Sequence, residues 1–136
     1  MKLVCVSKSI KLREKKNSDN VHLFTQYFIP SNKHRHDELK KCLKLNALNR
    51  DVYKIHLLVE RTYTISELGT SSDKIIQTVI GKRLTFQEVF MYIRTNRIRG
   101  YLVLLNSDIC FGSTALINLK RSELHVKKQA LALLRY

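Results

Sequence analysis

The sequence lacks long hydrophobic runs and is poor in proline and glycine. One Pro and four Gly in 136 residues leave no obvious flexible linker, and no internal repeat is present. Nothing approaches the roughly 20 apolar residues of a membrane-spanning helix, and the apolar run at residues 3–6 is too short for a signal peptide. We therefore expect one cytoplasmic domain with no membrane span.

Cysteine is also scarce. Cys5, Cys42 and Cys110 are odd in number and widely spaced, with no Cys-x-x-Cys pair and no His at metal-ligand spacing. His34 and His36 are two residues apart, so on a helix they do not share a face. The sequence predicts reduced thiols without disulfides or structural zinc, and histidines at the surface.

Acidic residues are few. Lys plus Arg total 25 against 11 Asp plus Glu, which gives a net charge of +14, concentrated in the first 50 residues. A basic surface attracts nucleic acid, anionic lipid or a diphosphate through the same field, and it also keeps a protein soluble. The cations are scattered, with no strongly basic stretch interleaved with exposed aromatics. The charge predicts that a partner is negatively charged but does not identify its chemistry.

The pattern of apolar residues predicts alternating strands and helices. Residues 1–20 are expected to form a basic peripheral strand or arm, with a possible strand at 2–7, and residues 21–136 to form an α/β domain. The predicted strands are 21–29, 52–59, 74–80 and 101–105, and the predicted helices are 33–48, one that begins with the Thr85-x-x-Glu88 capping box, and 113–119 capped by Ser113. Residues 128–136 form either a strand or a helix.

The order of these elements predicts the fold class. Alternation of strands and helices favours a mostly parallel, Rossmann-like sheet with helices on both faces. The apolar run 101–105 is typical of a strand at the centre of such a sheet.

Ligands bind at the carboxyl ends of the strands in parallel sheets. Polar residues in or near the end of the first predicted strand, and after each of the other three, are therefore expected to converge on one site. They are Thr25 and Gln26, then Glu60, then Lys82 and Arg83, and finally Asn106 and Asp108.

From residue 21 onward the sequence resembles the glycosyltransferases of type A fold, which use nucleotide-diphospho-sugars. The resemblance is carried by Phe24-Thr25-Gln26, Arg83-Leu84-Thr85-Phe86, Asn106-Ser107-Asp108-Ile109 and the closing Leu133-Leu134-Arg135-Tyr136. In that family an Asp-x-Asp motif holds a divalent cation on the diphosphate. Asn106-Ser107-Asp108 looks like its counterpart, so the resemblance implies a Mn²⁺ or Mg²⁺ ion on Asp108. It also implies donor contacts from Thr25, Gln26, Glu60, Arg83 and Asn106.

The motif departs from the family pattern at its first position. Asn106 supplies a neutral amide where the family has a carboxylate, so metal affinity should fall unless a basic residue such as Arg83 shares the phosphate. Asn-Ser-Asp is also typical of an ordinary strand-end turn or helix cap. Likewise Thr85 is first a helix cap, and Glu60 is equally explained as an exposed charge at a strand end.

A second departure is at the end of the chain. Complete type A domains continue into an acceptor-binding half that usually supplies the catalytic carboxylate, and here the sequence stops at Tyr136, so no general base can be named. Two hypotheses follow. The chain is a glycosyltransferase-like protein, truncated or inactive, that binds a nucleotide-diphospho-sugar. Alternatively, it is a noncatalytic basic protein that binds nucleic acid or a protein partner.

Overall fold

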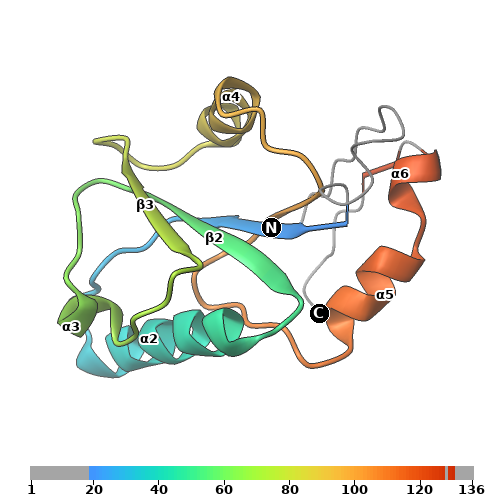
Figure 1. Ribbon diagram of the computed structural model, residues 1–136. Helices are drawn as coiled ribbons and strands as arrows, with labels where there is room; N and C mark the ends of the chain where they lie inside the picture. Colours follow the sequence, from blue (N-terminus) through green and yellow to red (C-terminus); the bar gives the residue numbers. More distant parts are fainter. Residues whose placement is uncertain (1–18, 128, 131–136) are drawn as a thin grey trace.

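The sheet has four parallel strands. A computed structural model describes residues 19–127, 129 and 130 of the protein (Figure 1). The strands lie in the order β3-β2-β1-β4, and every neighbouring pair is parallel. They are β1 (Val21–Thr25), β2 (Val52–Val59), β3 (Ile75–Val79) and β4 (Tyr101–Leu104). The predicted α/β class with a parallel sheet is confirmed.

Helices cover both faces of this sheet (Figure 1). They are α2 (Lys33–Leu48), α3 (Ile65–Leu68), α4 (Phe86–Thr95), α5 (Ala115–Arg121) and α6 (Leu124–Lys127). The expected helices on both faces are thus present, and at this coarse level the arrangement is Rossmann-like.

None of the described helices has the length and apolar character needed to cross a membrane.

Successive residues of a strand pack into two separate hydrophobic cores, one on each face of the sheet. Leu23 of β1 packs with the face that α2 and α5 cover, and the next residue, Phe24, packs with Val89 of α4 on the opposite face. This follows from the two-residue period of a strand. Burial of each such side chain contributes about 1.5–3 kcal/mol.

The long helix α2 forms where the sequence predicts it. Asn32 caps it by accepting a hydrogen bond from the backbone N–H of Arg35 at 3.2 Å. Leu39, Leu43 and Ala47 are buried, as their helical spacing indicates. The predicted cap of α4 is also confirmed, because the Thr85 hydroxyl accepts a hydrogen bond from the N–H of Glu88.

Two strand predictions need correction. The first strand ends at Thr25 rather than at residue 29, because the chain leaves the sheet at Gln26 while its composition stays aromatic and β-branched. β4 is not central but lies at one edge of the described sheet. Its apolar run reflects burial on both faces, since Val103 packs in one core and Leu102 in the other.

The helix predictions also missed some elements. α3 was not expected, although Thr64 and Glu67 form a complete capping box at its start. The N-cap of α5 is Thr114, which makes no side-chain cap bond, so Ser113 is not the cap. α6 was not expected either. The possible strand at 2–7 lies outside the described residues, as does 128–136 except for Gln129 and Ala130, which are in neither a helix nor a strand.

A polar chain is buried between the sheet and α4. His22 Nδ1 lies 3.0 Å from His56 Nε2 on the neighbouring strand, and His56 Nδ1 lies 3.2 Å from the hydroxyl of Tyr92 on α4. Thr78 of β3 donates to that hydroxyl at 3.3 Å. Burial lowers the pKa of His22 and of His56 to about 4, so both rings are neutral at pH 7.

Candidate functional site: a cleft where the strand order reverses

The strand order creates a crevice between β1 and β4. The chain runs from β1 outward through β2 to β3 and then returns to place β4 on the other side of β1 (Figure 1). The connection from β1 to β2 contains α2 on one face of the sheet, and the connection from β3 to β4 contains α4 on the other face. In open α/β sheets, this reversal point is where ligands bind.

A cleft of about 910 Å³ opens at this point. The polar residues that the carboxyl-end rule selects come together there, as expected, and Asp108 shares the cleft with Arg83. Its lining includes Thr25, Gln26, Glu60, Arg83, Asn106 and Asp108. Lys82 is not among the lining residues, because its ammonium group pairs with Glu88 at 2.6 Å.

Gln26 positions the loop that carries Arg83. Its side-chain amide donates to the carbonyl of Lys82 at 3.0 Å, and its carbonyl oxygen accepts from the N–H of Leu84 at 3.1 Å. Both ends of the amide are thus used by the backbone on either side of Arg83. Among residues 19–127, 129 and 130, Arg83 has no carboxylate partner, so its guanidinium is available to an anion.

Asn46 of α2 holds the other loop of the cleft in the same manner. It donates to the carbonyl of Ile109 at 2.9 Å and accepts from the N–H of Phe111 at 3.0 Å. Asn46 is buried, and it fixes the segment that follows Asp108 against α2. The sequence signal was a polar residue beside Ala47 on the apolar stripe of the helix.

Arg35, which the sequence analysis did not select, also lines the cleft. Its guanidinium donates to Asp108 at 2.7 Å and to Glu38 at 2.8 Å. The hydrogen bond that Arg35 donates to Asp108, followed by the one that it donates to Glu38, raises the pKa of Arg35. Asp108 lies 73 residues away along the chain, so no local pattern predicts this pair.

Two free thiols lie behind the Asp108 loop. Cys42 of α2 and Cys110 are both free, and the Cys110 thiol neighbours that of Cys42. Burial, followed by the neighbouring thiol, raises the pKa of Cys42 to about 11, so this thiol is protonated at pH 7. The prediction of free cysteines is confirmed for these two, and Cys5 lies outside the described residues.

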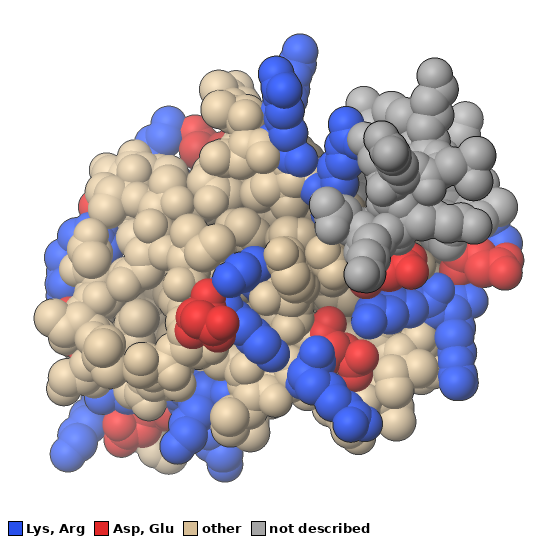
Figure 2. Space-filling model, viewed as in Figure 1, with Lys and Arg blue, Asp and Glu red and all other residues tan. Residues whose placement is uncertain are grey.

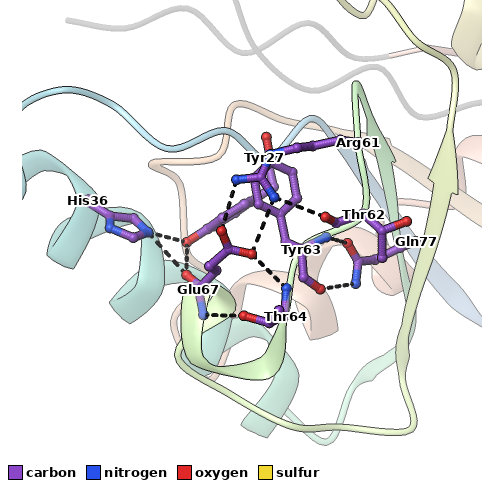
Figure 3. Close-up of polar contacts among 8 residues, drawn as sticks. All are labelled: Tyr27, His36, Arg61, Thr62, Tyr63, Thr64, Glu67 and Gln77. Carbon is purple, nitrogen blue, oxygen red and sulfur yellow. Dashed lines mark hydrogen bonds and ion pairs between the residues drawn. The ribbon is translucent and has the colours of Figure 1, made fainter.

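A hydrogen-bonded cluster supports the wall of the cleft (Figure 3). Tyr27, which follows Gln26, donates through its hydroxyl to the carbonyl of Glu67 at 2.7 Å, and His36 Nε2 lies 3.0 Å from the same hydroxyl. His36 is therefore partly buried and bonded, which corrects the prediction of a surface residue, whereas His34 is exposed as expected. The cluster fixes the start of α2, where Arg35 lies next to His36.

The Glu67 carboxylate organises the other half of this cluster (Figure 3). It pairs with Arg61 at 2.9 Å and accepts from the N–H of Thr64 at 2.8 Å. The hydrogen bond from Arg61, and to a smaller extent the one from the backbone N–H of Thr64, lowers the pKa of Glu67 to about 2. Gln77 of β3 exchanges two 2.9 Å hydrogen bonds with the backbone of Tyr63. The turn after β2, which begins at Glu60, is thereby tied to β3.

The cleft contains two carboxylates, those of Glu60 and Asp108, and the carboxylate of Asp108 is ion-paired with Arg35. Across the described part of the chain, no group of three or more His, Cys, Asp or Glu side chains is placed to hold a metal. On a nucleotide, Mg²⁺ or Mn²⁺ is usually held by one or two carboxylates together with the phosphates.

Aromatic side chains border the same cleft. Phe28 and Phe86 both line it, and they are exposed at 46% and 40%. An exposed aromatic face can stack on a planar ligand group such as a nucleobase. The cleft thus combines two arginines with apolar, planar surface.

The comparisons with known proteins give no match. No family model, no curated protein and no solved structure matches this chain. The chemistry of the cleft therefore carries the functional assignment.

Proposed function

We propose that this protein binds a nucleotide-diphospho-sugar in the cleft between β1 and β4, as the nucleotide-binding part of a glycosyltransferase-like domain of type A. The observation that carries the proposal is the convergence, at the reversal point of the sheet, of the polar residues that follow all four strands. A volume of about 910 Å³ also lies within the usual range of ligand pockets.

The cleft offers a partner for each part of such a ligand. Arg35 and Arg83 supply guanidinium groups, which bind phosphate oxygens bidentately. Phe28 or Phe86 provides a face for the base. Glu60 is a carboxylate at a strand end, a type of residue that accepts hydrogen bonds from ribose hydroxyls.

The proposal concerns donor binding and leaves catalysis aside. Transfer to an acceptor needs a carboxylate or His within hydrogen-bond reach of the acceptor hydroxyl. Glu60 and Asp108 are the carboxylates that line the cleft. Asp108 is ion-paired with Arg35, and no acceptor site identifies either carboxylate as a base.

A thermal-shift experiment with uridine, guanosine and cytidine diphosphates, each with EDTA or with Mn²⁺, tests the proposal. A ligand at 100 times its Kd stabilises the folded state by about 2.7 kcal/mol. We expect at least one diphosphate to raise the melting temperature of the parent and to act less on Arg83→Gln. Arg50→Gln is the matched control, because Arg50 is exposed and does not line the cleft. Absence of any shift in the parent contradicts the proposal.

The charge supports a second candidate function, in which the protein is noncatalytic and binds nucleic acid. Residues 1–18 contain six of the 25 Lys and Arg residues. On the face that Figure 2 shows, the described cations are scattered, and several lie beside Asp or Glu. Such a distribution favours weak, nonspecific attraction of polyanions over a shaped nucleic-acid site.

A further inference from the structure

The cation nearest Asp108 belongs to the protein itself. The guanidinium of Arg35 bridges two carboxylates, those of Asp108 and Glu38, at 2.7 and 2.8 Å. Asp108 is the residue on which the family resemblance implies a divalent ion. The side chain of Asp108 is only 13% exposed, whereas that of Arg35 is 44% exposed. The arginine is therefore the more exposed partner of the pair, and it lines the cleft together with Asp108.

This arrangement opposes metal binding at Asp108. A divalent ion would have to compete with the guanidinium for a carboxylate that is largely shielded from water. The first position of the motif, Asn106, offers a neutral amide rather than a second carboxylate. The described residues provide no larger cluster of ligands to offset that exchange.

The same arrangement favours direct binding of an anion. A guanidinium carries five N–H donors, and two of them are used by Asp108 and Glu38. Three donors remain, on a group whose orientation is already fixed by its two carboxylates. Arg83 lines the same cleft, and Gln26 holds the backbone on both sides of it. The lining also carries the carboxylates of Glu60 and Asp108, so the two arginines would bind a diphosphate through directed hydrogen bonds rather than through net positive charge.

We propose that Arg35 takes the place of the divalent cation, so that the protein binds a nucleoside diphosphate directly through Arg35 and Arg83 without a metal. This inference rests on the proposed function, since it concerns the same cleft. It specifies the ligand group that Arg35 contacts, the diphosphate, and the role of Asp108, which is to position Arg35 rather than to ligate an ion.

Calorimetric titration of uridine, guanosine and cytidine diphosphates into the full chain tests this inference. For the diphosphate that binds, we expect equal affinity in EDTA and in Mn²⁺. Arg35→Gln should weaken binding in EDTA by about tenfold or more, because a charged bidentate contact is lost. Arg35→Lys should restore part of the affinity, since it keeps the charge without the planar fork. Arg50→Gln is the control, because Arg50 is exposed and does not line the cleft.

The outcomes separate this inference from the proposed function. Binding by the parent that requires Mn²⁺, or an Arg35→Gln variant that binds like the parent in EDTA, overturns the role of Arg35 and leaves the nucleotide site in place. No binding of any diphosphate in either condition overturns the proposed function itself. Circular dichroism melting of each variant separates a lost contact from a lost fold.

Discussion

The side-chain amide of Gln26 is hydrogen-bonded to the backbone on both sides of Arg83, at the residue before it and at the residue after it. Gln26, which directly follows β1, thus determines where the loop between β3 and α4 places the guanidinium of Arg83. Sequence reasoning selected both residues as ligand contacts, but the geometry gives them different roles. Gln26 positions the loop, and Arg83 lines the cleft.

Gln26→Ala is therefore expected to weaken binding of a nucleoside diphosphate indirectly, because the Gln26 side chain acts through the position of Arg83. Removal of both bonds leaves the Lys82 carbonyl and the Leu84 N–H without this partner and frees the loop. We expect a loss of affinity of about tenfold. Calorimetry measures the loss, and Gln87→Ala on the exposed surface of α4 is the control. Parent-like affinity would mean that the loop keeps its position without Gln26.

The sequence predicted the cleft well because one topological rule was sufficient. Polar residues after Thr25, Val59, Val79 and Leu104 had to converge once the strands were parallel and neighbouring. The rule depends only on approximately where the strands end: the first strand was predicted to end at residue 29 and ends at Thr25, yet Thr25 and Gln26 were still selected.

What the sequence did not reveal are long-range pairs. Arg35 reaches Asp108 across 73 residues, and Asn46 reaches Ile109 across 63. No spacing marks such contacts, since they depend on how α2 packs against the loop. The edge position of β4 was missed for a related reason, because an apolar run reports burial on two faces and does not report the number of neighbouring strands.

Asn106→Asp tests how close the cleft is to a metal site. A second carboxylate beside Asp108 should lower the affinity for a diphosphate in EDTA by repulsion, and Mn²⁺ should then restore it. Titrations with EDTA and with Mn²⁺ measure both effects. Asn118→Asp, on the exposed surface of α5, adds the same charge outside the cleft and should show neither. Adding Asp108→Asn to the Asn106→Asp variant should abolish the Mn²⁺ effect; if it persists, the ion binds elsewhere.

The buried histidine pair predicts a loss of stability in mild acid. The pKa of His22 and that of His56 fall from 6.5 to about 4 on folding, chiefly through burial, with Lys54 contributing to both. The unfolded chain therefore binds more protons between these values, and the free energy of unfolding decreases as pH falls from about 6.5 toward 4. We expect a loss of about 1–3 kcal/mol per histidine.

Urea denaturation at pH 7, 6, 5 and 4.5 measures this loss. The range separates the histidines from Glu67, whose pKa falls from 4.5 to about 2 and whose contribution is lost only at lower pH. His34→Gln, at an exposed position, should leave the profile unchanged. A free energy of unfolding that stays constant across this range would contradict neutral burial of His22 and His56.

Tyr27→Phe tests the cluster that supports the cleft wall. The substitution removes a buried hydroxyl that donates to the Glu67 carbonyl and lies beside His36. We expect destabilisation of about 1–2 kcal/mol, measured by urea denaturation at pH 7. Tyr53→Phe, at an exposed position on β2, is the control and should change stability little.

The charge of +14 predicts weak binding to polyanions that salt abolishes. Electrostatic association releases counterions, so affinity for RNA of random sequence should fall by orders of magnitude between about 50 and 200 mM salt. Fluorescence anisotropy measures this dependence. Binding that persists at high salt and discriminates among sequences would favour the nucleic-acid function over the nucleotide site.

The contacts through the buried histidines tie three strands to α4. Thr78 of β3 and His56 of β2 both lie within hydrogen-bond distance of the Tyr92 hydroxyl, and His56 lies 3.0 Å from His22 of β1. A neutral imidazole carries one N–H, so His56 can donate either to His22 or to the Tyr92 hydroxyl but not to both. The tautomer of His56 therefore sets the direction of both hydrogen bonds that it makes, and protonation of its ring removes the acceptor from one of them.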